Sequence, residues 1–166
     1  MAYVALLRGI NLGKKNKVDM KSLKALFEEM GFQNVRTYIQ TGNVIADNLA
    51  CDEQQIESNL KATYGFDIPV IIRSKEELES LQQHDLFSKD NVYIMFLKNQ
   101  LSNEQLQLLE TLVDDEFTAI DNKAIIINLS KNYHQTKYTN TFFEKKLEMP
   151  STARNSNTVN KILLKM

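Results

Sequence analysis

Residues 8–18, RGINLGKKNKV, have the composition of a loop that could bind an anion. The stretch combines two glycines with four basic side chains, and it lies between an apolar run and a predicted amphipathic helix. Backbone N–H groups in a glycine-containing turn can form a concave nest for an anion, and the lysines would add positive charge. The alternative is a turn that only reverses the chain, and the residues leave both interpretations open.

The loop does not have the spacing of a Walker A phosphate-binding loop. That motif requires four residues between its glycines, a Ser or Thr after the lysine, and a helix that begins immediately. Here Gly9 and Gly13 enclose three residues, Lys15 stands where a hydroxyl would bind magnesium, and the helix is expected only near Met20. We therefore expect neither a nucleotide–magnesium site of that kind nor another cofactor.

Candidate catalytic residues are few. The chain has only two histidines, His84 and His134, neither at a metal-ligand spacing, and no G-x-S-x-G motif. We interpret residues 114–116, Asp-Asp-Glu, as a solvated acidic turn. His134 near Lys137 is the best candidate for proton transfer, but an ordinary exposed loop histidine is the simpler interpretation. We predict no metal site, and the sequence does not decide whether the protein is an enzyme.

A second polar motif lies in the predicted strand at residues 35–40. Its alternation places Arg36, Tyr38 and Gln40 on one face, which is basic, aromatic and polar. The surrounding element order invites comparison with the RNA-recognition module, whose third strand carries stacking aromatics, but residues 43–47 contain none. Tyr38 could still stack on a base in another geometry, or it could serve only in packing.

A third motif, residues 151–159, is rich in hydrogen-bond donors and precedes the last predicted helix. Asn155 or Ser156 can cap that helix. Arg154 suits a carboxylate or phosphate as a two-pronged donor, unless it pairs with a neighbouring acid.

The charges are unevenly distributed along the chain. Residues 1–42 carry +4, residues 43–129 carry −10, and residues 130–166 carry +5, which together give the net charge of −1. If the two ends meet, they form a positive surface, whereas separate lysines would be ordinary solvated side chains. The single cysteine, Cys51, excludes an intramolecular disulfide, and no apolar run is long enough for a membrane helix, so we expect a cytoplasmic protein without membrane partners.

The predicted elements indicate an α+β protein. Residues 2–8, 19–30, 35–40, 43–47, 52–64 and 68–73 fit the order β-α-β-β-α-β. After a helix near 74–83, residues 92–97, 102–113, 117–121, 124–129 and 138–147 repeat that order as far as β-α-β-β-α. The final segment, 156–165, has a helical pattern where a last strand might stand. We predict two packed ferredoxin-like halves, at 1–74 and 75–166, the second ending in helices.

Three ordered segments carry a resemblance to a known family: YVALLRGINLGKKNKVDM at 3–20, VRTYIQTGNV at 35–44 and FEKKLEMPSTARNSNTV at 143–159. The chain resembles the bacterial family called domain of unknown function 1697. The resemblance implies a two-part α+β fold and supplies no reaction. The chain departs from the family pattern at Lys14, where the family has Gly, and at Ser156, where it has Trp.

We interpret the three motifs as one anion-binding site for a nucleotide or a nucleic-acid backbone. The resemblance marks mostly polar residues in all three motifs, and the basic ends of the chain agree with this interpretation. Two alternatives stay open: an enzyme acting on a phosphorylated small molecule, and a structural or interaction protein that could form a homodimer. The predicted binding residues are Arg8, Asn11, Lys17, Arg36, Tyr38, Gln40, Arg154, Asn155 and Asn157.

Overall fold

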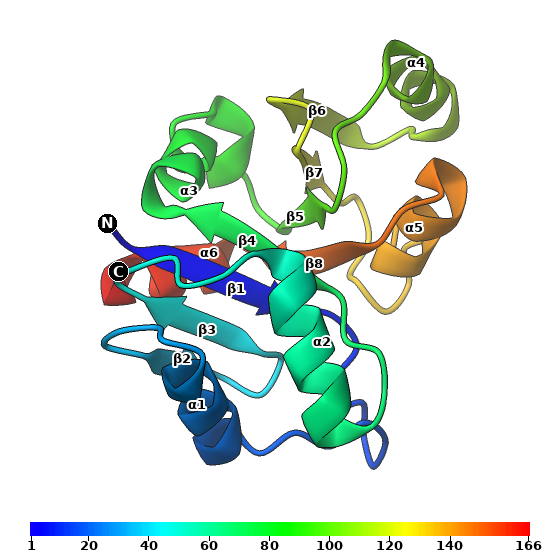
Figure 1. Cartoon of the computed structure of the whole chain (residues 1–166). Helices are drawn as coiled ribbons and strands as arrows, with labels where there is room; N and C mark the ends of the chain where they lie inside the picture. Colours follow the sequence, from blue (N-terminus) through cyan, green and yellow to red (C-terminus); the bar gives the residue numbers. More distant parts are fainter. The chain divides into compact units, whose positions relative to one another are not determined.

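The first half of the chain follows the predicted β-α-β-β-α-β order (Figure 1). The computed structural model describes residues 1–166, which form two units: unit 1 is Met1–Leu78 with Lys161–Met166, and unit 2 is Glu79–Asn160. Unit 1 contains β1 (Tyr3–Leu7), α1 (Met20–Glu29), β2 (Arg36–Tyr38), β3 (Asn43–Ala46), α2 (Glu53–Tyr64) and β4 (Val70–Ser74), and α3 (Lys75–Gln82) follows. The strands form an antiparallel sheet in the order β2-β3-β1-β4, which is the ferredoxin-like arrangement.

Unit 2 repeats this topology. After the short 3-10 helix η1 (Asp85–Ser88) it contains β5 (Val92–Leu97), α4 (Asn103–Leu112), β6 (Glu116–Ile120), β7 (Ala124–Asn128), α5 (Asn140–Leu147) and β8 (Ser151–Asn155), and α6 (Ser156–Lys165) ends the chain. Its antiparallel sheet has the order β6-β7-β5-β8. The prediction of an α+β fold with two ferredoxin-like halves is confirmed.

The absence of a last strand from the second half was a wrong prediction. Ser151–Asn155 form β8, which pairs with β5, and only then does α6 begin. Their polarity favoured a helix cap over a strand, yet Ser151 and Thr152 are buried in the sheet. The hydroxyl of Ser151 bonds Asn140 Oδ1 at 2.6 Å, so buried polar side chains replace the expected apolar ones.

Side-chain caps define where the helices begin. Asp19 accepts a hydrogen bond from the backbone N–H of Ser22 at 3.0 Å at the start of α1. Asp52 and Gln55 form a capping box at the start of α2, as Ser102 and Gln105 do for α4. Each such cap satisfies N–H groups that the helix itself leaves unpaired.

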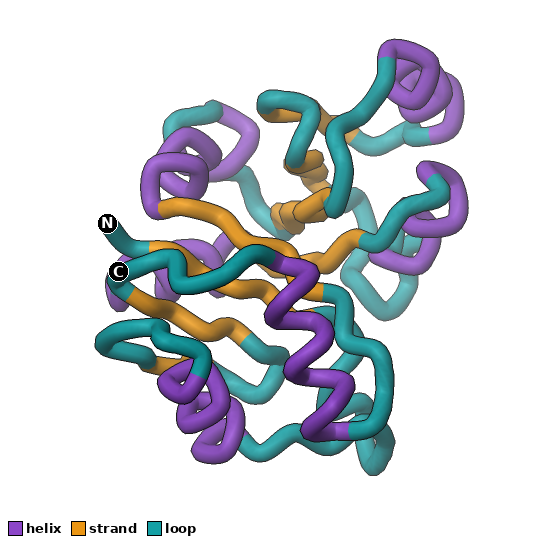
Figure 2. The backbone as a smooth tube through the Cα atoms, in the orientation of Figure 1, coloured by secondary structure: helices purple, strands orange, loops and turns teal.

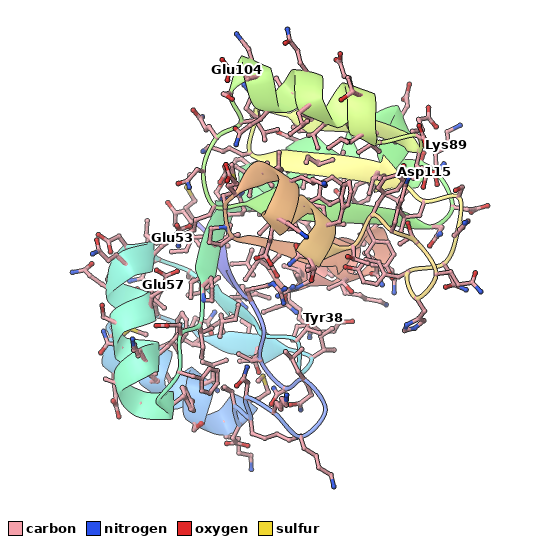
Figure 3. The ribbon with its side chains drawn as sticks, turned by 90° about the vertical axis from the view of Figure 1, so that its right-hand side faces the viewer. Tyr38, Glu53, Glu57, Lys89, Glu104 and Asp115 are labelled. Atoms are coloured by element: carbon pink, nitrogen blue, oxygen red, sulfur yellow. The ribbon has the colours of Figure 1, made fainter.

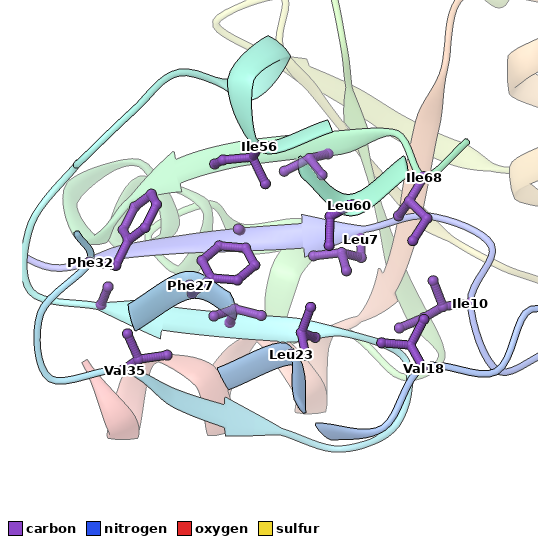
Figure 4. Packing of buried hydrophobic residues seen from close by; sticks show 14 residues of the cluster. Leu7, Ile10, Val18, Leu23, Phe27, Phe32, Val35, Ile56, Leu60 and Ile68 are labelled. Carbon is purple, nitrogen blue, oxygen red and sulfur yellow. The ribbon is translucent and has the colours of Figure 1, made fainter. Parts of the chain in front are cut away.

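The core of unit 1 lies between one face of its sheet and helices α1 and α2 (Figure 4). Alternate strand residues such as Leu7 and Val44 contact Leu23 and Phe27 of α1 in this cluster. Leu6, on the opposite face, is also buried, so this strand is covered on both faces of the sheet.

The core of unit 2 has the same construction. Figure 2 shows the strands and helices of both units in separate colours. Met95 and Ile125 of the sheet pack with Leu109 of α4 and with Phe143 of α5. Because both sheets bury one face under two helices, each β-hairpin and strand end is held at a fixed position relative to its own core.

The two units also correspond residue by residue in their last strands. Arg73 pairs with Val4 of β1, and Arg154 pairs with Ile94 of β5 at the same position of the repeat. Each arginine is 7% exposed, and each donates from Nη1 to the carbonyl of the preceding residue at 2.9 Å. The repeat therefore extends to a buried guanidinium, which marks Arg154 as part of the sheet architecture.

Glutamates cover the outer edge of β4 in unit 1. Glu57 accepts from the N–H of Val70 at 2.8 Å, and Glu53 accepts from that of Ile72 at 2.7 Å; Figure 3 labels both carboxylates on α2. The next outward amide, that of Ser74, donates to Glu77 Oε1 at 2.9 Å. These bonds occupy the N–H groups with which another chain could pair at this edge.

Candidate anion-binding site

The loop at residues 8–18 is an ordered structure that ends in a tight hairpin. The backbones of Leu12 and Lys15 exchange hydrogen bonds of 3.0 and 2.9 Å, which places Gly13 and Lys14 at the tip. Gly13 has a φ of +59°. We call residues 12–17 the lysine hairpin.

Asn11 holds the base of the lysine hairpin. Its Oδ1 accepts from the N–H of Val18 at 2.9 Å, and its Nδ2 donates to the carbonyls of Val18 at 3.1 Å and Gln40 at 2.8 Å. Asn16 makes a single side-chain bond, from Nδ2 to the carbonyl of Gly9 at 3.0 Å. Asn11 is therefore a positioning residue, which ties the hairpin to the turn that follows β2.

The basic side chains of the lysine hairpin are unpaired. Lys14, Lys15 and Lys17 are exposed, and none lies within ion-pair distance of a carboxylate. The backbone N–H groups of Gly13, Lys14, Asn16 and Lys17 donate to no group of the protein. Arg8 precedes the hairpin and is half-buried, and its N–H donates to the carbonyl of Pro69 at 3.0 Å.

The turn at residues 39–42 lies beside this loop at the same end of the sheet. Gly42 accepts from the N–H of Leu7 at 2.9 Å, and it has a φ of +93°. Asn43 is fully buried and donates from Nδ2 to the carbonyl of Tyr38 at 2.9 Å. Gln40 has an exposed side chain that bonds no group of the protein, so its amide is available to a ligand.

Arg36 takes part in internal contacts. Its Nη1 donates to Asp47 Oδ1 at 2.8 Å and to the carbonyl of Asn34 at 2.7 Å, and its Nε donates to the carbonyl of Lys165 at 2.8 Å. Hydrogen bonds from Asn34 and Arg36 hold the pKa of Asp47 below the ordinary carboxyl value.

Tyr38, on the same strand, lies next to the cationic end of the chain. The Lys165 ammonium is 5.6 Å from the centre of the Tyr38 ring, a cation–π contact within unit 1 (Figure 3 labels Tyr38).

The third predicted motif lies in unit 2, where it forms β8 and the start of α6. Arg154 is buried and donates from Nη1 to Thr152 Oγ1 at 2.6 Å. Asn155 caps α6 by accepting from the N–H of Thr158 at 2.7 Å, whereas Asn157 is exposed. Within unit 1, by contrast, the structure directly joins the first two motifs through the bond from Asn11 to Gln40.

The candidate proton-transfer residues occupy an ordered loop of unit 2. Asn132 Oδ1 accepts from the N–H of His134 at 3.0 Å, and the imidazole is exposed. The Lys137 ammonium lies 5.3 Å from the centre of the Tyr138 ring. A hollow of about 320 Å³ adjoins this loop and is lined by Asp114, Asp115, Ser130, Lys131, Gln135, Thr136, Lys137 and Tyr138. His134 does not line it, and no group of three or more His, Cys, Asp or Glu side chains is arranged to hold a metal.

A larger open groove of about 720 Å³ lies between α1 and α2 and includes Cys51. Desolvation, with a smaller contribution from Asp52, raises the pKa of the Cys51 thiol, so the thiol is less reactive than a free one.

Two residues, Leu12 of the lysine hairpin and Ile39 of the adjoining turn, were not predicted as site residues from the sequence. Leu12 and Ile39 are large aliphatic side chains that are 53% and 44% exposed. The predicted strand at residues 35–40 continues through Ile39, and its alternation puts Ile39 on the face opposite Arg36, Tyr38 and Gln40. In the structure the strand ends before Ile39, whose φ is +52°. The sequence does not indicate this turn, because β-branched residues rarely adopt a positive φ.

Comparison with known proteins gives a family and a fold. The family model described as "Protein of unknown function (DUF1697)" matches residues 1–125, which include the first two motifs and end before the third. A similar solved structure is that of the conserved bacterial protein SP0830 from Streptococcus pneumoniae, with a TM-score of 0.74 and 24% identity over 99% of this chain and 97% of that one. This similarity shows the shared fold alone. The search of curated proteins gave no match. No helix here has the length and apolar character needed to cross a membrane.

Proposed function

The chain belongs to the DUF1697 family of proteins of unknown function, and we propose that it binds a nucleic-acid backbone through the lysine hairpin. The observation that carries this proposal is the combination of three exposed, unpaired lysines with a hairpin that internal hydrogen bonds hold in place. An ordered loop loses less conformational entropy on binding than a flexible one.

The charge of the surrounding chain supports a polyanion as the ligand. Residues 8–18 contain four basic and no acidic side chains, and α1 adds Lys21 and Lys24 on exposed positions. Lysines that have no carboxylate partner keep their charge available, and phosphate contacts of this kind release counterions from a nucleic acid.

The proposal rests on the unit 1 members of the site expected from the sequence: Arg8, Asn11, Lys17 and Gln40. That Arg36, Tyr38, Arg154, Asn155 and Asn157 join them stays a prediction. An enzyme of phosphorylated small molecules and a homodimeric interaction protein stay as alternatives.

Replacing the three lysines tests the proposal. In the variant carrying Lys14→Gln, Lys15→Gln and Lys17→Gln, we expect the affinity for single-stranded RNA and duplex DNA at low salt to fall by about tenfold or more. The slope of log K against log salt should become shallower by about two, because up to three phosphate contacts are lost. Fluorescence anisotropy between low and moderate salt measures both quantities.

The matched control carries Lys89→Gln, Lys145→Gln and Lys146→Gln, three exposed lysines of unit 2, and so has the same change in net charge. Its affinity and salt slope should stay close to those of the unchanged protein. Equal losses in both variants would show that binding follows net charge alone, and the lysine hairpin would then not be the site.

A further inference from the structure

Ile39 is the only β-branched residue in this protein whose backbone has a positive φ. Eight residues other than glycine have a positive φ: five are Asn, one is Asp, one is Glu, and the eighth is Ile39 at +52°. Asn and Asp tolerate this conformation, whereas a β-branched side chain is strained in it. At six of the other seven positions the chain uses Asn or Asp, which suit the geometry, and none of the seven is β-branched.

Burial does not compensate for this strain. The side chain of Ile39 is 44% exposed, and it is not a member of the apolar core of unit 1. An asparagine or glycine would adopt the same backbone at lower cost. An isoleucine that is both strained and exposed serves neither the turn nor the core, which points to a contact outside the protein.

The position of Ile39 joins it to the lysine hairpin. Asn11 Nδ2 donates to the carbonyl of Gln40 at 2.8 Å. Leu12 follows Asn11 in the chain and Ile39 precedes Gln40, so this bond brings their two loops together. Leu12 is 53% exposed. The two adjoining loops therefore carry two exposed aliphatic side chains together with the exposed lysines and the unbonded amide of Gln40.

We propose that Leu12 and Ile39 form an apolar contact for the unstacked bases of a single-stranded nucleic acid whose phosphates meet the lysine hairpin. This inference rests on the proposed function and names the ligand of that same site. Bases in a duplex are stacked and present only their edges, whereas single-stranded bases expose apolar faces that pack on side chains. The Gln40 amide can bond a base edge exposed in the same way.

A lipid surface fits these observations less well. Helices that lie in a membrane interface bury a broad apolar face, and here only two aliphatic side chains accompany the polar Gln40. The combination of isolated apolar contacts, an amide and lysines matches the parts of a nucleotide: base face, base edge and phosphate.

The variants Ile39→Asn and Ile39→Gly test this inference, because both remove the strain and the apolar contact together. We expect the affinity for a single-stranded RNA oligonucleotide to fall by about fivefold, the low end of the effect of losing one base-packing side chain. Duplex DNA affinity should not change, and the melting temperature should rise by about 2 to 4 °C. Anisotropy titrations and thermal unfolding of the full chain give the three readouts.

Leu49→Asn is the matched control, since Leu49 is a similarly exposed aliphatic residue of unit 1 outside the two loops. Unchanged single-stranded affinity in both Ile39 variants would overturn the inference, and so would an equal loss for duplex DNA. Ile39-dependent binding to vesicles containing phosphatidylserine, with no Ile39 effect on RNA, would overturn it in favour of a lipid ligand. If the triple lysine variant lost RNA binding while the Ile39 variants kept their RNA affinity, the proposed function would stand and this inference would be wrong.

Discussion

Gly42→Ala is expected to lower the free energy of unfolding by about 2 to 4 kcal/mol. A Cβ at this position would lie 2.9 Å from Leu7 Cβ and 2.7 Å from Ile10 Cδ1, closer than real Cβ contacts. The first of these contacts involves an atom fixed to the backbone of β1, so relief requires a movement of the strand or the turn. The φ of +93° adds the cost of a left-handed alanine.

Gly65→Ala separates the two contributions to that loss. Gly65 has a similar φ of +85°, and a Cβ at this position would have no atom within 4 Å beyond its chain neighbours. Its substitution should therefore cost about 1 kcal/mol, the conformational part alone. Urea denaturation of both variants measures the difference. Equal losses would contradict the close packing of the turn at residues 39–42 against Leu7 and Ile10.

Asn11→Gly is expected to cost roughly 2 kcal/mol in stability, because about 1 kcal/mol is typical of each hydrogen bond and part of the loss is recovered by water. The side chain of Asn11 makes three bonds, to the N–H and carbonyl of Val18 and to the carbonyl of Gln40. Glycine accepts the φ of +52° found at Asn11, so the substitution removes the bonds without straining the backbone.

Asn16→Gly is the control for that substitution, since Asn16 has a φ of +55° and makes one exposed side-chain bond. We expect it to cost less than about 1 kcal/mol. Asn11→Gly should also weaken RNA binding, because it releases the lysine hairpin from the turn after β2. Urea denaturation measures the stability of each variant, and fluorescence anisotropy on the same preparations measures its affinity for RNA. Similar stabilities for the two variants would argue against Asn11 as the residue that positions the hairpin.

The order of elements was predictable because hydrophobic periodicity and helix caps act locally. Asp19 and Asp52 cap the helices that the sequence predicts at 19–30 and 52–64, and Gly65 ends α2 with a φ of +85°. Strand β8 was missed because its buried residues, Ser151 and Thr152, are polar. Their burial depends on partners distant in the sequence, such as Asn140, which no local pattern shows.

The candidate site was predictable in part for the same reason. The glycines and lysines of residues 8–18 indicate an anion-binding loop by composition. The link from Asn11 to Gln40 joins residues 29 positions apart, and the conformation of Ile39 depends on the turn it occupies. Arg154 shows a second limit: the sequence indicates a guanidinium suited to an anion, but it does not show that this side chain is buried in β8 and bonds Thr152.

Mapping the backbone amides during titration with single-stranded RNA tests the central claim most directly. The protein has a mass of 19.1 kDa, which suits two-dimensional 15N NMR of the full chain. We predict that the amides of residues 12–17 and 39–41 shift first and furthest, and that these shifts weaken as salt is added. Shifts concentrated instead around the groove between α1 and α2, or around the hollow beside Lys137, would contradict nucleic-acid binding by the lysine hairpin, as would a spectrum unchanged by RNA.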